Sequence, residues 1–309
     1  PMTIHRAIGL MSGTSMDGID VALIKTDGEA VLRRGPGREF PYDASFRRRI
    51  EASLETAKQI TDRSERPGDL RALEQDITRR HAEAVRRFLA ETGERVDAID
   101  VIGFHGQTVL HRPEKALTVQ IGDGQLLADI TGINVVYDLR ANDMTHGGQG
   151  APLVPVYHQA LAASQQGDGI TAFVNIGGIA NVTFVGGGNP VAFDTGPGNA
   201  LIDQWVQANA GIPFDDGGRI ASEGSVDDAR VTAFLGHDYF RRKLPKSLDR
   251  NGFSPDLVAG MELSDGARTL AAMTARSILV SAEHAQGEVS RWIICGGGRR
   301  NTSIMAELA

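Results

Sequence analysis

Two segments of the sequence share one pattern, and this pattern constrains the fold more than any other feature. In residues 8–24 (IGLMSGTSMDGIDVALI) an apolar run meets a turn of small and acidic residues, and a second apolar run follows. Residues 171–185 (TAFVNIGGIANVTFV) repeat this pattern around a turn at Gly177 and Gly178. Short apolar runs joined by glycine-containing turns indicate antiparallel strand pairs. We therefore predict a duplicated architecture in which each lobe begins with a hairpin.

The rest of the chain alternates strand-like and helical segments. Residues 71–91 place apolar side chains at helical spacing and Gly93 follows them, which predicts an amphipathic helix. His81 lies on the apolar face, so we expect a packed structural histidine. The other expected elements are strands at 4–10, 19–26, 98–104, 116–122, 133–139 and 291–295, and helices at 124–131, 199–210 (capped by Asn199) and 267–284. This alternation is typical of an α/β protein with helices against a sheet.

The length of the chain indicates two domains. A chain of 309 residues is long enough for about two domains of ordinary size. Residues 163–169 (ASQQGDG) are polar and contain glycine, which marks a plausible boundary. We assign residues 1–165 to an N-terminal lobe and residues 166–309 to a C-terminal lobe.

Composition argues against several kinds of partner. The formal net charge of −7 and the pI near 5.6 disfavour a nucleic-acid backbone. Cys295 is the only cysteine, so a disulfide framework and a thiolate metal cluster are not expected, which fits a reducing cytoplasm. No apolar stretch approaches the roughly 18 residues of a membrane span, and the early first strand leaves no room for a signal peptide. We expect a cytoplasmic protein that binds neither nucleic acid nor membrane.

The glycine-containing turns are candidates for phosphate binding. The sequence has no G-x-x-x-x-G-K-[ST] loop, no G-x-G-x-x-G after a strand, no H-E-x-x-H and no G-x-S-x-G, which removes most support for the corresponding sites. Bare backbone N–H groups in the two hairpin turns could still hold phosphates, and Asp17 suits a magnesium ion held through water. Gly296–Gly298 follow a strand directly, which favours a flat platform for adenine or ribose. The alternative is that these are tight turns without a ligand.

Polar residues also follow predicted strands in the first lobe. His105 and Gln107 come after the strand at 98–104, at the strand end where α/β sheets place ligands. In residues 137–155 (YDLRANDMTHGGQGAPLVP), Asp143 lies between a strand end and a glycine run, where a ligand can approach. Asp138 in the same segment is expected to cap a turn.

A similar pattern is found in the second lobe. In FDTGPGN, Asp194 and Gly196 precede a predicted helix N-terminus, a site suited to an anion or a sugar hydroxyl. A carboxylate at a strand end in each lobe is therefore a candidate site residue.

Seven motifs together resemble one family over nearly the whole chain. They are GLMSGTSMDGID, GFHGQTVLH, QIGDGQLLA, DLRANDMTHGGQGAPLVP, VNIGGIANVT, FDTGPGNALID and CGGGRRN. This combination is similar to that of the anhydro-N-acetylmuramic acid kinases. The resemblance implies two RNase-H-like lobes of the actin/hexokinase/heat-shock-chaperone ATPase superfamily around a nucleotide cleft. It also implies that ATP and water convert 1,6-anhydro-N-acetylmuramic acid into N-acetylmuramic acid 6-phosphate in cell-wall recycling, and that the protein forms a homodimer.

The resemblance assigns roles to residues of this sequence. It implies that Asp143 is the catalytic residue and that Asp17 is the residue near Mg²⁺. The ATP-binding residues that it implies are Gly13, Thr14, Ser15, Met16, Asp17, Gly18, Ile19, Asp20, Gly177, Gly178, Asn181, Gly296, Gly297 and Gly298. The residues expected to face the amino sugar are His105, Gln107, Arg140, Gln149, Asp194 and Gly196.

The sequence departs from the family pattern in a few places. The chain stops at Ala309, one short helix after CGGGRRN, where relatives continue, so we expect the C-terminal lobe to be incomplete. PKSLDR (245–250) replaces the family's PKSTGR, and Leu139 occupies a position where an aromatic residue is more usual. Two other functions remain open: another sugar or acetate kinase of the same superfamily, and a nucleotide-binding protein without catalysis.

Overall fold

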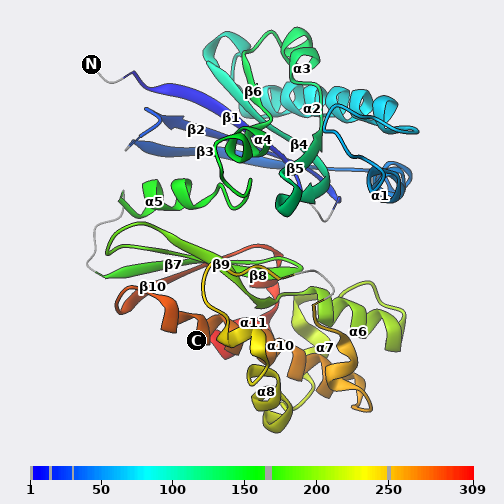
Figure 1. Ribbon diagram of the computed structural model, residues 1–309, viewed down its shortest axis with the longest axis vertical. Helices are drawn as coiled ribbons and strands as arrows, with labels where there is room; N and C mark the ends of the chain where they lie inside the picture. The colour runs from blue at the N-terminus through cyan, green and yellow to red at the C-terminus, as the bar shows by residue number, and fades with distance from the viewer. Residues whose placement is uncertain (1–2, 14–15, 30, 164–168, 249–251) are drawn as a thin grey trace. The chain divides into compact units, whose positions relative to one another are not determined.

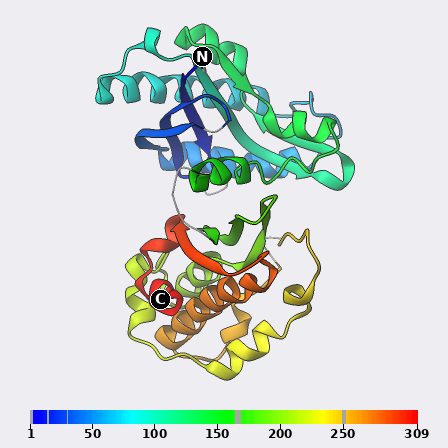
Figure 2. The same cartoon turned by 90° about the vertical axis from the view of Figure 1, so that its left-hand side faces the viewer.

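The computed structural model describes residues 3–13, 16–29, 31–163, 169–248 and 252–309. The chain divides into two compact units, Pro1–Leu153 and Val154–Ala309 (Figures 1 and 2). The boundary predicted from the sequence lies farther along the chain, after helix α5 (Pro155–Ala163), which packs with the second unit. His158 of α5 stacks on Phe173, with ring centroids 4.4 Å apart.

The first unit is built on a mixed sheet. Its strands are β1 (His5–Ser12), β2 (Gly18–Thr26), β3 (Leu32–Pro41), β4 (Val101–Arg112), β5 (Leu117–Ile121) and β6 (Val135–Tyr137). The order is β3-β2-β1-β4-β5, and β6 also pairs with β4. β1, β2 and β3 are antiparallel neighbours, whereas β4 runs parallel to both β1 and β6. The N-terminal hairpin predicted from residues 8–24 is confirmed as β1 and β2.

Helices cover the sheet of the first unit. They are α1 (Ala44–Ala57), α2 (Leu70–Thr92), α3 (Gly124–Thr131) and α4 (Leu139–Thr145). Figure 1 shows α2 and α3 along one face of the sheet, where Val85 and Phe88 of α2 join a buried cluster with Ile102 of β4. Burial of each such side chain contributes about 1.5–3 kcal/mol. α2 ends at Gly93 as predicted, because this glycine adopts φ 70° in the left-handed region that favours glycine.

The second unit has a four-stranded sheet. β7 (Ile170–Ile176), β8 (Ile179–Val185) and β9 (Val191–Pro197) are antiparallel, and β10 (Val289–Cys295) lies parallel beside β7. The order, β9-β8-β7-β10, matches that of β3-β2-β1-β4 in the first unit. Its helices besides α5 are α6 (Ala200–Ala210), α7 (Arg219–Ser222), α8 (Asp228–Leu235), α9 (Asp238–Arg241), α10 (Leu263–Val280) and α11 (Thr302–Leu308). Figure 2 shows α10 running along the sheet, and its apolar side chains join the buried core of this unit.

Both units therefore contain a three-stranded antiparallel meander with a parallel fourth strand beside the first. This arrangement confirms the α/β class and the RNase-H-like strand order expected of each lobe. Within the described parts of the chain, every helix is too short or too polar to traverse a bilayer.

Some elements differ from those expected. β4 does not end at residue 104 but continues to Arg112, because a bulge at Gly106 (φ 69°) lets the strand bend and go on. β3 was not predicted, since its sequence LRRGPGREFP is rich in glycine and proline; it is an edge strand, where proline is tolerated. Residues 139–145 form helix α4, which was not among the expected elements. Asn199 occupies the N-cap position of α6 as expected, but its side chain makes no capping hydrogen bond.

His81 has the structural role expected of it. Its side chain is fully buried in α2, Nδ1 lies 2.8 Å from the carbonyl oxygen of Ile77, and its ring meets Phe104 edge-on. Nε2 has no hydrogen-bond partner among the described residues. Burial lowers the pKa of His81 to about 4, because the charged imidazolium would lose its hydration.

The buried neutral His81 predicts acid sensitivity of the fold. In the unfolded chain His81 takes up a proton below pH ~6.5, whereas in the folded chain it does so only near pH 4. Between these values the unfolded state binds more protons than the folded state. The free energy of unfolding should therefore decrease as the pH is lowered from ~6.5 toward 4, by on the order of 3 kcal/mol. The free energy of unfolding, measured with urea between pH 7.5 and 4.5, should depend less on the pH in His81→Leu than in the wild type. Thr78→Val, which removes a buried but non-titrating hydrogen bond of α2, should keep the wild-type pH dependence; equal slopes in all three proteins would contradict this account.

Candidate functional site

The candidate site of the first unit lies at one edge of its sheet. β4 has β1 on one side and β6 on the other, all parallel, with Ser12 paired to Gln107 and Tyr137 paired to Phe104. The loop after β1 and helix α4 after β6 therefore both begin at the carboxyl ends of their strands, at the same edge of the sheet. Ligands of α/β sheets bind at the carboxyl ends of parallel strands.

The backbone of the loop after β1 is held on both sides. The Met16 N–H donates to the carbonyl oxygen of Gly13 (3.1 Å), and the Tyr42 N–H donates to that of Asp17 (2.8 Å). Thr14 and Ser15, which were predicted to bind ATP, lie outside the described residues.

Three other residues assigned to this loop form its frame. The side chains of Met16 and Ile19 are buried in the cores, 6% and 2% exposed. Gly18 lies against β3, where a Cβ atom would come within 2.6 Å of the carbonyl oxygen of Phe40. Gly18 is thus required by strand packing as well as being a candidate for ligand binding.

Carboxylates gather beside this loop on the exposed side of the hairpin. The pKa of Asp20 is raised, first by partial burial and then by the negative charges of Glu39 and Asp17. Such a concentration of negative charge fits a divalent cation. The described residues contain no group of three or more His, Cys, Asp or Glu side chains able to hold a metal ion. The residues present therefore fit a Mg²⁺ ion that keeps water and phosphate ligands, rather than a site made of protein side chains alone.

Gln107 faces the loop after β1. Its side chain is 0% exposed, and its amide bonds with Ser12 and with the carbonyl oxygen of Gly13. This placement differs from the sugar contact predicted from the sequence. The bulge at Gly106 gives the physical reason: residues 105 and 107 would share one face of a regular strand, but the extra residue separates their environments.

Asp143 is enclosed by the glycine run that follows it. The carboxylate oxygen Oδ2 accepts the Gly150 N–H at 2.8 Å, and the main-chain oxygen of Asp143 accepts the N–H groups of His146 and Gly148. A Cβ atom on Gly148 would lie 2.0 Å from Oδ2. The run GGQG therefore holds a half-buried carboxylate by backbone groups and leaves no room for a side chain at Gly148. Gln149, between these glycines, is exposed.

His105 and Arg140 form a connected pair behind this carboxylate. Arg140 donates from Nε to His105 Nε2 (2.9 Å) and from Nη1 to the carbonyl oxygen of Gly150 (2.8 Å). His105 Nδ1 lies 2.7 Å from the carbonyl oxygen of Gly106, which makes Nδ1 the protonated nitrogen and Nε2 the acceptor. Burial, and next the charge of Arg140, lower the pKa of His105. The neutral His105 thus holds Arg140 in place. Arg140 in turn holds Gly150, whose N–H donates to the Asp143 carboxylate.

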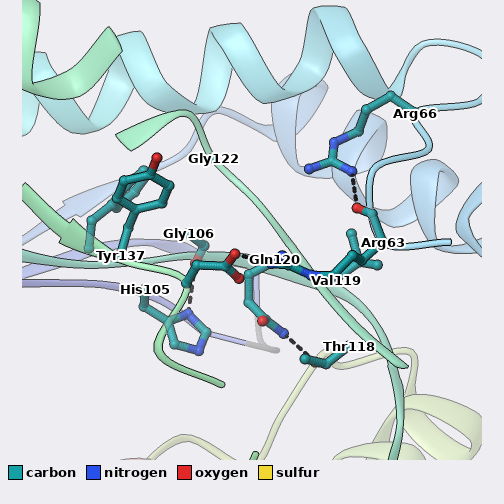
Figure 3. A pocket seen from close by; sticks show the side chains of 11 residues that line it. Arg63, Arg66, His105, Gly106, Thr118, Val119, Gln120, Gly122 and Tyr137 are labelled. Atoms are coloured by element: carbon teal, nitrogen blue, oxygen red, sulfur yellow. Dashed lines mark hydrogen bonds and ion pairs between the residues drawn. The ribbon is translucent and has the colours of Figure 1, made fainter. Parts of the chain in front are cut away.

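A small polar pocket opens beside His105 (Figure 3). Its volume is about 90 Å³, and its lining residues are Arg63, Arg66, Phe104, His105, Gly106, Thr118, Val119, Gln120, Gly122, Tyr137 and Asp138. The charged and polar side chains among these residues suit a polar group of a ligand.

Two polar groups of the pocket were missed or misassigned from the sequence. Asp138 does not cap a turn: it adopts φ 63°, makes no side-chain capping bond, and pairs with Arg63. Gln120 donates from Nε2 to Thr118 and Thr108, while its buried Oε1 has no partner among the described residues. Arg63 lies in none of the quoted motifs, and Gln120 is the first residue of QIGDGQLLA, a motif to which no site residue was assigned.

The second unit presents backbone at the matching edge of its sheet. Cys295 of β10 pairs with Asn175 of β7 in parallel, so Gly177, Gly178 and Gly296–Gly298 leave the sheet at one edge. The carbonyl oxygens of Gly177 and Gly178 accept the N–H groups of residues 198–200 at the start of α6.

The glycines at this edge fall into two groups. A Cβ atom on Gly296 or Gly298 would lie 2.6 Å from Asn175 Oδ1 or 2.2 Å from Ile176 Cγ2, so packing requires these two. Gly177, Gly178 and Gly297 would meet nothing closer than 3.5 Å and have no positive φ. The fold does not require glycine at these three positions. Gly178 and Gly297 are exposed and leave backbone that a ligand can approach, whereas the N–H of Gly177 donates to the carbonyl oxygen of Ile179. Asn181 lies on β8 opposite Asn175.

Asp194 and Gly196 lie within β9, and the helix N-terminus expected after them is that of α6, with Asn199 at its N-cap position. Asp194 Oδ2 accepts the Leu248 N–H at 2.8 Å, and burial raises the pKa of Asp194. A Cβ atom on Gly196 would lie 2.7 Å from Ser277 Oγ. Asp194 thus anchors the segment around Leu248, and Gly196 allows close packing on α10.

Comparison with known proteins now gives the family. A family model described as anhydro-N-acetylmuramic acid kinase matches residues 5–309. The chain belongs to this family. The anhydro-N-acetylmuramic acid kinases of Rhizobium etli and Agrobacterium fabrum are 54% and 55% identical to it, each over 99% of this chain and 83% of the relative. Component A of (R)-2-hydroxyglutaryl-CoA dehydratase from Acidaminococcus fermentans is 10% identical over 98% of this chain and 87% of that one, with a TM-score of 0.47, a likeness too distant to add to the assignment.

As a member of the anhydro-N-acetylmuramic acid kinases, the chain is a kinase of an amino sugar. At the edge of its first sheet, the structure brings together the loop after β1, Gln107, the pair His105 and Arg140, and Asp143. Ser12, Tyr42 and Gly148 take part in this arrangement but were not assigned from the sequence, because their roles depend on contacts between distant segments.

The tight enclosure of Asp143 predicts that Gly148→Ala will impair this kinase with little loss of fold. The new methyl group would lie 2.0 Å from Oδ2 of Asp143, so the carboxylate would have to move. Such misplacement can cost ~10²-fold in turnover. Gly147→Ala is the matched control: its Cβ atom meets nothing within 4 Å, although φ 85° makes alanine strained there. We expect sugar-dependent ADP release to fall far more in Gly148→Ala than in Gly147→Ala, with thermal unfolding measured in parallel. Equal turnover in the two variants would show that the position of the Asp143 carboxylate does not matter.

Proposed function

We propose that this chain uses ATP and water to convert 1,6-anhydro-N-acetylmuramic acid into N-acetylmuramic acid 6-phosphate, with Asp143 as the base. Family membership supports the reaction. The observation that most supports the residue is the Asp143 carboxylate, held by the Gly150 N–H at the edge where the loop after β1 also begins. Membership of this family does not favour the two alternative functions. These are another sugar or acetate kinase, and a nucleotide-binding protein without catalysis.

The proposed reaction resembles inverting glycoside hydrolysis, in which a carboxylate activates water opposite the leaving oxygen. Asp143 takes a proton from water, the water oxygen bonds to C1 of the sugar, and the bond from C1 to O6 breaks. O6 then bonds to the γ-phosphorus of ATP, and the bond from that phosphorus to the ADP oxygen breaks. Phosphoryl transfer itself needs mainly positioning and charge neutralisation, so a single protein base suffices.

The nucleotide phosphates are assigned to the loop after β1, from Gly13 to Asp20. In support, this loop has a backbone fixed by Met16 and Tyr42 and exposed carboxylates at Asp17 and Asp20. Mg²⁺ bound with the phosphates would neutralise their charge, and Asp17 would hold it through water. In the second unit, Gly177, Gly178 and Gly297 are proposed to contact the nucleotide, Gly178 and Gly297 through exposed backbone, with Asn181 beside them and Gly296 and Gly298 as their packed support.

The amino sugar is assigned to the surroundings of His105 and Arg140. We infer that the pocket beside His105 takes one small polar substituent of the sugar, because its lining includes the unpartnered Oε1 of Gln120 and the paired Arg63 and Asp138. Gln149 is exposed near Asp143 and is retained as a candidate contact. We assign Asp194 and Gly196 structural roles only: Asp194 binds the backbone of Leu248, and Gly196 allows β9 to pack closely on α10.

We further propose a homodimer, which the family resemblance supports, and a cytoplasmic location, which the single cysteine supports. Light scattering of the purified protein at micromolar concentration tests the dimer directly.

Asp143→Asn should abolish turnover and keep nucleotide binding. The amide cannot accept the proton of water, and loss of a general base costs about 10²–10⁴-fold. The measurement is coupled ADP release with the 1,6-anhydro sugar, with a free reducing hexose and without sugar, together with calorimetric ATP binding. Asp129→Asn, an exposed exchange on α3, serves as control. Near-normal turnover of Asp143→Asn would remove Asp143 as the base, and preference for the hexose would remove the proposed substrate.

Gln120→Leu should weaken sugar binding without affecting ATP. The variant removes the amide that lines the pocket, and loss of one hydrogen bond to a ligand costs about 0.5–1.5 kcal/mol, or up to about tenfold in KM for the sugar. Gln125→Leu removes a similar amide from the surface of α3 and should leave both KM values unchanged. An unchanged KM for the sugar in Gln120→Leu would exclude the pocket as part of the sugar site.

A further inference from the structure

We infer that Gln107 and Tyr42 are positioning residues that hold the two ends of the proposed phosphate loop, at Gly13 and at Asp17, and that Gln107 does not contact the sugar. The inference rests on the proposed assignment of ATP phosphates to residues 13–20. It departs from the sequence pattern, in which Gln107 stands beside His105 as a substrate ligand.

The amide of Gln107 is fully used by the start of the loop. Ser12 Oγ donates to Gln107 Oε1 at 2.6 Å, and Gln107 Nε2 donates to the carbonyl oxygens of Gly13 (3.3 Å) and Thr108 (3.4 Å). A flipped amide would set Oε1 against two carbonyl oxygens, so these partners fix its orientation. With 0% of Gln107 and 1% of Ser12 exposed, the side chain reaches no ligand.

Tyr42 connects the start of the loop to its end. Its hydroxyl donates to Ser12 Oγ at 3.1 Å, and its backbone N–H donates to the carbonyl oxygen of Asp17 at 2.8 Å. Burial raises the pKa of Tyr42 to about 12, so the hydroxyl keeps its proton near neutral pH. The ring is held edge-on against Phe46, with centroids 5.0 Å apart.

Ser12 connects Tyr42 with Gln107, because its hydroxyl accepts a hydrogen bond from Tyr42 and donates one to Gln107. The chain on both sides of residues 14 and 15 is thus tied to β4 and to the segment after β3. A loop fixed before the ligand arrives loses less entropy on binding. This network should therefore affect the affinity for the triphosphate and not the affinity for the sugar.

Separate KM values for the two substrates test this inference. Gln107→Met keeps the volume but removes both hydrogen-bonding functions, and Gln107→Glu keeps the acceptor for Ser12 while placing an oxygen against the Gly13 carbonyl. Both variants should raise KM for ATP by about tenfold or more, as expected for a lost buried hydrogen bond, and leave KM for the anhydro sugar within about twofold. Tyr42→Phe, a milder change, should raise KM for ATP by about threefold.

Because Tyr42 and Gln107 act through the same hydroxyl, the double variant should show less than the sum of the two single effects. Thr78→Val, a buried exchange in the same unit that does not contact the loop, should leave both KM values unchanged. Thermal unfolding of each variant checks the fold, and Tyr42→Phe still tests the inference if a Gln107 variant does not fold.

A rise in KM for the sugar with an unchanged KM for ATP would overturn the inference and restore Gln107 as a substrate ligand. Calorimetric affinity for MgATP separates this result from failure of the proposed function. If the wild type binds MgATP but shows no sugar-dependent ADP release, the proposed reaction fails, while weaker MgATP binding by Tyr42→Phe and Gln107→Met still supports the positioning role. Unchanged MgATP affinity in these variants, or no MgATP binding by the wild type, would overturn it.

Discussion

β4 pairs in parallel with β1 on one side and with β6 on the other, and every candidate group of the first unit takes its position from this arrangement. Parallel strands expose their carboxyl ends at one edge of a sheet. The loop after β1 and helix α4 after β6 therefore begin beside the same stretch of β4. Without the parallel pairing, the glycine-rich turn near residue 13 and the carboxylate of Asp143 would belong to unrelated surfaces.

Both units share the order of four strands, but they place different chemistry at the equivalent edge. In the first unit, side chains form connected networks: Ser12 bonds Gln107, and Arg140 joins His105 to the backbone that bonds Asp143. In the second unit the edge consists of backbone, with Gly178 and Gly297 left open and their neighbours closely packed. Directional side chains suit proton transfer and recognition, whereas open backbone suits close approach of a large ligand.

The sequence predicted long and regular features well, for physical reasons. The helix at 71–91 and the two hairpins have strong periodicity and clear turn residues, which act locally. β3 was not predicted because an edge strand tolerates the glycine and proline that usually end strands. The environment of Gln107 was not predictable either. Residues i and i+2 of a regular strand share a face, and the bulge at Gly106 places His105 and Gln107 in different surroundings.

The sequence by itself determined the α/β class, the two related hairpins and, through the combination of its motifs, the family. These features depend on local patterns that survive without knowledge of distant contacts. Only the tertiary structure decided which polar groups bond one another: that Tyr42 and Gln107 meet at Ser12, that Gly148 must lack a side chain beside Asp143, and that Gln120 lines a pocket. Hydrogen bonds and steric contacts act over a few ångströms in space and join residues far apart in the chain, so they follow from strand register and packing.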